Sequence, residues 1–214
     1  MPIGHVRCII VGMKPENTRA EDINKILFGL YTPFAEIERA INWPSNSERL
    51  ENDAEHSFSL ALVSGIMAAK LNLDANKATA LAIVHDLIEI HAGDTSIWDN
   101  DGLETKAARE LSSFQKLKKD YKKQYPWLIE TIEEYEVLGS EEAKLVYALD
   151  KLIAVLMIIE NDGYFWKENG ITYQDYYKKA MQKREQVAEH PVILELYDEI
   201  MLVLKVHQNE YFAV

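Results

Sequence analysis

Apolar residues recur at three- and four-residue spacing along most of the chain, and this spacing predicts helices throughout. Glycine and proline are sparse, with 9 and 6 residues among 214, so few positions force the chain to turn. The alternation of strands and helices that builds a parallel sheet does not occur. The pattern predicts an all-α fold, a single-domain helical bundle, with helices over 21–41, 53–71, 75–91, 104–124, 126–137, 140–161, 172–188 and 191–209.

Residues that favour helix ends support several of these boundaries. Asn52, with Glu55 three residues later, has the spacing of a capping box. Asp74 and Ser140 each precede a run of helix-forming residues, as N-cap residues do. Pro191 suits the first position of a helix, where no backbone N–H is needed.

Three of the predicted core-facing stripes each contain one polar residue. Positions 56, 60, 63 and 67 read His, Leu, Val, Met; positions 78, 81, 85 and 88 read Ala, Leu, His, Ile; and positions 146, 150, 153 and 157 read Val, Asp, Ile, Met. The polar residues are His56, His85 and Asp150, all of types that bind metal ions. An isolated carboxylate such as Asp150 in an apolar layer would cost at least several kcal/mol, so it must be paired or metal-bound. The alternatives are a buried salt bridge, for instance to Lys151, and histidines that are satisfied within the core.

The doublet His85-Asp86 favours the metal. Adjacent helical residues point about 100° apart, so both reach one ion only near a helix end or in a crowded bundle centre. The doublet is predicted about two turns before the end of its helix, and Glu89 and Asp94 follow it. Two imidazoles and two carboxylates suit Mn²⁺, Co²⁺, Fe²⁺ or Zn²⁺ better than Mg²⁺ or Ca²⁺. The sequence therefore predicts one divalent ion.

Charge and cysteine content narrow the class of protein. The net charge of −12 argues against binding to nucleic acid or to an anionic membrane. A small anionic substrate remains compatible if a metal or local cations offset that charge. A single cysteine, Cys8, forms no internal disulfide, which favours a cytoplasmic location. No apolar run reaches the ~18 residues that span a bilayer. Residues 1–20 are expected to form a tail or extension, with a weak strand or tail at Cys8–Val11, and 21–214 the domain.

A histidine, a distant His-Asp doublet and a later aspartate form the signature of the HD-domain superfamily of metal-dependent phosphohydrolases, which this chain resembles. The surrounding residues are similar to the 5′-deoxynucleotidase branch, over roughly residues 25–205. The similar segments are Arg49-Leu-Glu-Asn-Asp-Ala-Glu-His56-Ser, Ala82-Ile-Val-His85-Asp86-Leu-Ile-Glu89-Ile-His-Ala-Gly93-Asp94, Trp127, Glu134-Tyr135-Glu136, Ala148-Leu-Asp150-Lys and His190-Pro191.

The resemblance implies a helical HD-type fold that hydrolyses deoxynucleoside 5′-monophosphates to deoxynucleoside and phosphate. It also implies a homodimer, as relatives are commonly dimeric. Glu89 would orient or deprotonate the attacking water, and Asp94 would protonate the leaving 5′-oxygen or hold the sugar. The implied metal ligands are His56, His85, Asp86 and Asp150.

The chain departs from this branch at the arginine that grips the substrate phosphate in relatives. That arginine precedes a Trp-Pro or Gly-Trp segment, and here Ala40 or Asn42 falls in its place before Trp43. Arg39 and Arg49 are the candidates to replace it, since a guanidinium fork suits a phosphate. Trp43 is a candidate for the base or sugar pocket.

Other readings stay open. Only one histidine, His91, lies between the doublet and Asp150, which favours a one-metal site over the two-metal branches of the superfamily. Ile88-Glu89-Ile90 lacks the Glu-Asp pair typical of hydrolases of stringent-response nucleotides, and nucleoside triphosphates usually go with larger, more basic chains. A non-catalytic helical module that binds a nucleotide or a protein, with a structural metal, is the alternative from another class.

Overall fold

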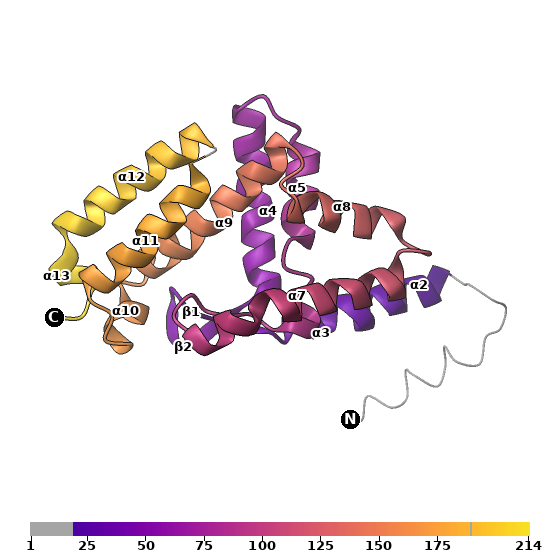
Figure 1. The fold of residues 1–214 in the computed structure, drawn as a ribbon, viewed down its shortest axis with the longest axis horizontal. Helices are drawn as coiled ribbons and strands as arrows, with labels where there is room; N and C mark the ends of the chain where they lie inside the picture. Colours follow the sequence, from indigo (N-terminus) through magenta and orange to yellow (C-terminus); the bar gives the residue numbers. More distant parts are fainter. Residues whose placement is uncertain (1–18, 189) are drawn as a thin grey trace.

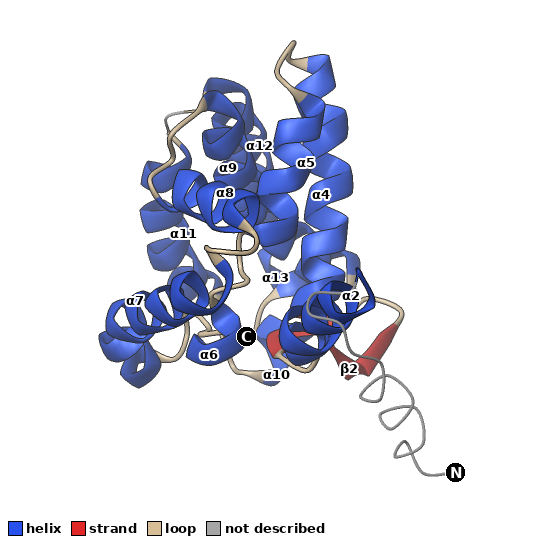
Figure 2. Ribbon diagram, turned by 90° about the vertical axis from the view of Figure 1, so that its right-hand side faces the viewer, coloured by secondary structure: helices blue, strands red, loops and turns tan. Residues whose placement is uncertain are grey.

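The computed structural model describes residues 19–188 and 190–214, which form a helical bundle with one small sheet (Figures 1 and 2). The predicted all-α class is confirmed. The expected tail at 1–20 and the weak strand or tail at Cys8–Val11 lie almost wholly outside the described residues. The elements are α2 (Arg19–Ile26), the π-helix η1 (Leu27–Tyr31), α3 (Thr32–Ala35), β1 (Glu38–Trp43), β2 (Asn46–Asn52), α4 (Asp53–Lys70), α5 (Ala75–Val84), α6 (Glu89–Ala92), α7 (Asn100–Tyr121), α8 (Pro126–Glu136), α9 (Glu141–Glu160), α10 (Tyr164–Glu168), α11 (Tyr173–Val187), α12 (Pro191–Val206) and α13 (Gln208–Tyr211).

Helices α4, α5 and α9 pack against one another at the centre of the molecule. Their facing apolar side chains, such as Leu60, Leu81 and Leu145, are fully buried. Helices α11 and α12 cover α9 on one side, while α7 and α8 lie on the other (Figure 1). Among the described residues, no helix has the length and apolarity needed to cross a membrane.

The predicted helix starts are confirmed. Asn52 and Glu55 form a reciprocal capping box at the start of α4. Asp74 accepts hydrogen bonds at the start of α5, and Ser140 accepts one at the start of α9. Pro191 occupies the first turn of α12.

The predicted helix over 21–41 is wrong beyond Ala35. The helical segments end at Ala35, and the chain then forms an antiparallel hairpin of β1 and β2 with an irregular register. Trp43 pairs with Asn46, so Pro44 lies in the two-residue turn, where its missing N–H breaks no sheet hydrogen bond. The hairpin strands contain polar and apolar residues that do not alternate regularly, so the sequence pattern did not predict them as strands.

The predicted helix over 75–91 is interrupted. Helix α5 ends at Val84, residues 85–88 form turns, and α6 begins at Glu89. The doublet was expected two turns before a helix end, and it instead follows the last residue of α5 directly. Two short helices, α10 and α13, fall outside the predicted set or beyond its boundaries.

Candidate metal centre and cavity

Three helical regions bring the four predicted ligand residues to one point. His56 lies in the first turn of α4, His85 and Asp86 follow the end of α5, and Asp150 lies in the middle of α9. His56 and His85 are 0% and 1% exposed, and Asp150 is 7% exposed. Residues 94 positions apart in sequence thus share one buried polar cluster.

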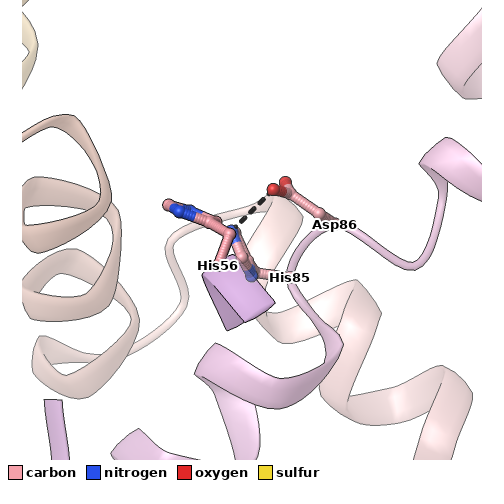
Figure 3. Close-up of side chains that lie close together, drawn as sticks. All are labelled: His56, His85 and Asp86. Atoms are coloured by element: carbon pink, nitrogen blue, oxygen red, sulfur yellow. Dashed lines mark ion pairs between the residues drawn. The ribbon is translucent and has the colours of Figure 1, made fainter. Parts of the chain in front are cut away.

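The ligand atoms lie within a few ångströms of one another. His56 Nε2 lies 2.9 Å from Asp150 Oδ1, and His85 Nε2 lies 2.8 Å from Asp86 Oδ2. His85 Nε2 is also 4.0 Å from Asp150 Oδ1. Figure 3 shows the His56, His85 and Asp86 side chains gathered together, and one ligand atom from each lies within 4.8 Å of the others. His56, His85 and Asp86 therefore form a group that could hold one ion, and Asp150 lies beside its two histidines.

The His85 ring is oriented to present one nitrogen to the cluster. Its Nδ1 donates a hydrogen bond to the Ala82 carbonyl oxygen at 2.9 Å, which directs Nε2 toward the cluster. Nε2 is buried and lies 2.8 Å from Asp86 Oδ2. A ring nitrogen and a carboxylate oxygen this close together fit two ligands of a single cation. The mixed N/O donor set suits a first-row transition metal ion.

Two buried acids that the sequence pattern missed lie behind this cluster. Glu51 and Asp53 are both 0% exposed. Glu51 Oε2 lies 3.6 Å from His56 Nδ1 and 3.5 Å from Arg39 Nε. Arg39 Nη1 lies 3.3 Å from Asp53 Oδ1 and 3.1 Å from Asp86 Oδ2. Glu51 behind His56, and the Arg39 cation among three acids, both help to hold the predicted ligand side chains in place.

The acids of the cluster change the protonation of His56. Burial and Arg39 disfavour a charged ring, but Asp150 and Glu51 outweigh them and raise the pKa of His56 to about 9. Burial opposes the charge of Asp86 too, yet His85 and Arg39 hold the pKa of that carboxyl below its usual value. Lys151 and His56 do the same for the pKa of Asp150. The predicted ligand carboxylates are therefore ionised at neutral pH.

Glu89 lies beside the cluster in a different electrostatic state. It is the first residue of α6 and is only 4% exposed. Burial, followed by the charges of Asp86 and Asp94, raises the pKa of Glu89 to about 10. Asp94 follows Gly93, whose positive φ of 74° turns the chain after α6. Glu89 and Asp94 both line the cavity described next.

A cavity of about 600 Å³ opens onto the cluster. His85, Asp86 and Asp150 form part of its wall, and Arg39 lines it as well. Its volume lies within the range that holds small-molecule ligands. Three of the four predicted ligands and both predicted catalytic acids thus face space that a substrate can enter.

The other two predicted substrate residues do not line this cavity. Arg49 Nη1 pairs with Glu55 Oε1 at 2.7 Å, and the Arg49 guanidinium lies 4.3 Å from the Trp43 ring centre. Of the three predicted substrate residues, only Arg39 is placed beside the ligand cluster. Arg39 lies on β1, so the helical spacing of apolar residues could not indicate that its side chain faces the cluster.

The cavity wall also contains lysines, of which the sequence analysis named only Lys151, and the salt bridge that it gave as the alternative for Asp150 is present. Lys151 pairs with Asp150 at 2.7 Å, and Lys106 lies 3.8 Å from Glu89. Lys179 and Lys183 of α11 line the cavity too. Two features of the sequence could have indicated these lysines: Lys151 directly follows Asp150, and Lys179 and Lys183 are four residues apart, on one face of a helix.

Comparison with known proteins assigns this arrangement to a family. The family model described as an HD domain matches residues 36–191. The 5′-deoxynucleotidase HDDC2 of Mus musculus is 31% identical over 159 residues, covering 72% of this chain and 75% of the relative. The Homo sapiens HDDC2 protein is also 31% identical, with 72% and 73% covered. A crystal structure of a predicted metal-dependent phosphohydrolase from Magnetospirillum magnetotacticum MS-1 superposes with a TM-score of 0.70 at 26% identity, covering 91% of this chain and 95% of that one.

Proposed function

The chain belongs to the HD-domain family of metal-dependent phosphohydrolases, and on that premise we propose that it hydrolyses deoxynucleoside 5′-monophosphates to deoxynucleoside and phosphate. The observation that carries the proposal is a buried cluster of His56, His85, Asp86 and Asp150, which reaches through the last three of these residues to the wall of a cavity that Glu89 also lines. The relatives described as 5′-deoxynucleotidases support the substrate class.

In this proposal His56, His85, Asp86 and Asp150 hold one divalent ion, of which Mn²⁺, Co²⁺, Fe²⁺ and Zn²⁺ suit the donors. When bound, such an ion lowers the pKa of a coordinated water and neutralises phosphoryl oxygens. Glu51 holds the His56 ring from behind, at 3.6 Å from Nδ1.

Arg39 is the residue that we propose grips the substrate phosphate. Its guanidinium lines the cavity within 3.1 Å of Asp86. Burial opposes its charge, but Asp86 and the neighbouring acids hold the pKa of Arg39 above its usual value, so the cation persists. A planar guanidinium can bind two phosphate oxygens at once. Arg49 is occupied by Glu55 outside the cavity.

Glu89 and Asp94 are proposed to move protons. Burial, followed by the charges of Asp86 and Asp94, raises the pKa of Glu89 to about 10, so Glu89 holds a proton in the metal-free protein. The predicted ligands would hold a cation close to Glu89, whose charge would favour the ionised carboxylate, and in that form Glu89 would accept a proton from the attacking water. Asp94, on the turn after α6, lines the same cavity, and we propose that it protonates the leaving 5′-oxygen or holds the sugar. A homodimer and a cytoplasmic location, expected from the sequence, complete the proposal.

The test is phosphate release from deoxy and ribo 5′-monophosphates, with di- and triphosphates alongside, in the presence of Mn²⁺ or Co²⁺. We expect release from the deoxy series by the wild type, and none by Asp86→Ala. Asp101→Ala removes an exposed acid from the first turn of α7 and serves as the matched control with unchanged activity.

Four outcomes would count against this proposal. Equal hydrolysis of ribonucleotides would contradict the sugar preference, and an active Asp86→Ala enzyme would contradict the site. Release confined to triphosphates or to stringent-response nucleotides would favour another HD hydrolase. Silence on all substrates, while added metal still raises the melting temperature, would favour a binding module with a structural metal.

A further inference from the structure

Helix α11 presents a stripe of hydrogen-bond donors to the cavity. Lys179, Gln182, Lys183 and Gln186 all line it, and their spacing of three and four residues places them on one helix face. Lys179 and Lys183 are half-buried on this face, where an amphipathic helix is ordinarily apolar, while Gln182 and Gln186 are exposed. This α11 donor stripe instead offers two ammonium groups and two amides, without a carboxylate. Its chemistry is complementary to an anion.

The two lysines of the stripe differ from the other cations of the cavity. Lys179 and Lys183 form no ion pair or hydrogen bond within the part of the chain that the structure describes. A charge that is partly removed from water without a partner is unfavourable. The other lining cations are paired: Arg39 with Asp86 at 3.1 Å, Lys106 with Glu110 at 3.0 Å and Lys151 with Asp150 at 2.7 Å.

The electrostatic state of Lys183 agrees with a missing counter-ion. Burial, together with the charges of Lys151 and Arg39, lowers the pKa of Lys183 to about 8. Asp150 and Asp94 act in the opposite direction but do not compensate. A bound anion would favour the charged ammonium and restore its pKa.

The lysines also lie where two cavities meet. Besides the cavity of about 600 Å³, both line a smaller one of about 110 Å³. Aromatic and aliphatic side chains, among them Trp98, Phe165 and Trp166, form the wall of the smaller cavity. A nucleotide has the same division, because its phosphate is anionic and its base is flat and largely apolar.

We propose that Lys179 and Lys183 form an anion subsite that binds a phosphate group of the nucleotide substrate. This inference rests on the proposed function and extends it with a contact on α11. The bound group is either the scissile 5′-phosphate or a second phosphate on the same nucleotide, and the experiment below distinguishes these two sources.

The test uses the metal-loaded full-length protein with Lys183→Gln, Lys179→Gln and the conservative Lys183→Arg. Lys178→Gln is the matched control, because Lys178 lies on the same helix but is 77% exposed and faces Asp175 at 3.9 Å. Calorimetry measures the affinity for inorganic phosphate. Steady-state kinetics measures kcat and KM for a deoxynucleoside 5′-monophosphate and for the corresponding 3′,5′-bisphosphate. Thermal melting verifies that each variant folds.

We expect Lys183→Gln to weaken phosphate-group binding about 10-fold or more, as loss of a charge-assisted hydrogen bond does. Lys179→Gln is expected to have a smaller effect in the same direction, and Lys183→Arg to restore binding. If the scissile phosphate occupies the subsite, inorganic phosphate affinity falls and both KM values rise. If a second phosphate occupies it, only KM for the bisphosphate rises.

Unchanged phosphate affinity together with unchanged KM values for both nucleotides, in both glutamine variants, would overturn the subsite. A fall in kcat alone would overturn it too, because a binding contact acts on KM. The calorimetric measurement needs no turnover. A chain that hydrolyses no monophosphate but loses phosphate affinity in Lys183→Gln would refute the proposed function and keep the subsite.

Discussion

Metal binding at this centre is expected to release a proton from His56. Asp150 Oδ1 lies 2.9 Å from its Nε2, and Glu51 lies 3.6 Å from its Nδ1. Against burial, these acids raise the pKa of His56 to about 9 in the metal-free protein. A metal ion binds only the neutral ring, so proton and metal compete for Nε2. Raising the pH removes the competing proton and should therefore strengthen metal binding.

The size of the effect follows from that pKa. A ring with a pKa of about 9 is neutral in about 1% of molecules at pH 7, because each pH unit changes the ratio tenfold. The apparent metal affinity at pH 7 is therefore about 100-fold below its limit at high pH, and it rises about tenfold per pH unit between roughly pH 6 and 8. Release of a proton from Glu89, whose pKa is also raised, would steepen this slope.

The raised pKa of His56 also determines whether the metal-free protein becomes more or less stable as the pH rises. The pKa of His56 in the folded chain lies above its ordinary value of 6.5. Its protonation therefore stabilises the fold fully below about pH 6.5, and this contribution disappears as the pH rises through about 9. We expect the metal-free melting temperature to fall between pH 7 and 9, and bound metal to offset the fall.

Calorimetric titration with Mn²⁺ or Co²⁺, in buffers of different ionisation enthalpy, measures both the affinity and the protons released. His207→Gln is the control, since that ring is exposed and pairs only with Glu210 among the described residues. Glu51→Gln removes one acid that raises the pKa of His56. The metal affinity of this variant should therefore reach its upper limit at a lower pH than that of the wild type. An affinity that stays constant from pH 6 to 8, with no proton released, would refute this reasoning.

Three further changes test the fold and the assembly. Leu145→Ala empties a fully buried position of the central cluster and is expected to lower the free energy of unfolding by about 2–5 kcal/mol in urea titrations; a change below about 1 kcal/mol would contradict the packing. Gly163→Ala puts a methyl group into the backbone of Tyr211 at a positive φ of 70°, so thermal melting should show a loss of about 1 kcal/mol or more, and an unchanged melting temperature would contradict the contact. Phe58, on an exposed face of α4 with Leu62, is 72% exposed, so light scattering should find Phe58→Glu monomeric where the wild type is dimeric; a monomeric wild type would contradict the dimer.

Helix periodicity predicted most of the bundle because the buried stripes of α4, α5 and α9 keep their spacing over several turns. The same reasoning located three of the four proposed ligands, as polar residues within those stripes. Asp86 came from its place beside His85. The hairpin was missed because β1 and β2 are short and mixed in polarity, and their conformation depends on packing against α4 and α9.

The spacing of apolar residues could not predict the buried acids behind the ligand cluster. Glu51 and Asp53 lie at the junction of β2 and α4, where they resemble the exposed acids common near a helix start. Only the fold shows that both are 0% exposed and face Arg39. Lys183 was hidden for a similar reason, since lysines on an amphipathic helix such as α11 usually face water.

The interruption after Val84 explains how one chain segment supplies two adjacent ligands. In a continuous helix the side chains of His85 and Asp86 would diverge by about 100°. Because α5 ends at Val84, the turn through 85–88 brings His85 Nε2 to 2.8 Å from Asp86 Oδ2. The His85 ring also donates to the Ala82 carbonyl oxygen in the last turn of α5, so one hydrogen bond caps the helix and selects the tautomer that leaves Nε2 to the cluster. The helix end and the metal-binding geometry therefore depend on the same side chain, and a residue that continued the helix here would remove both.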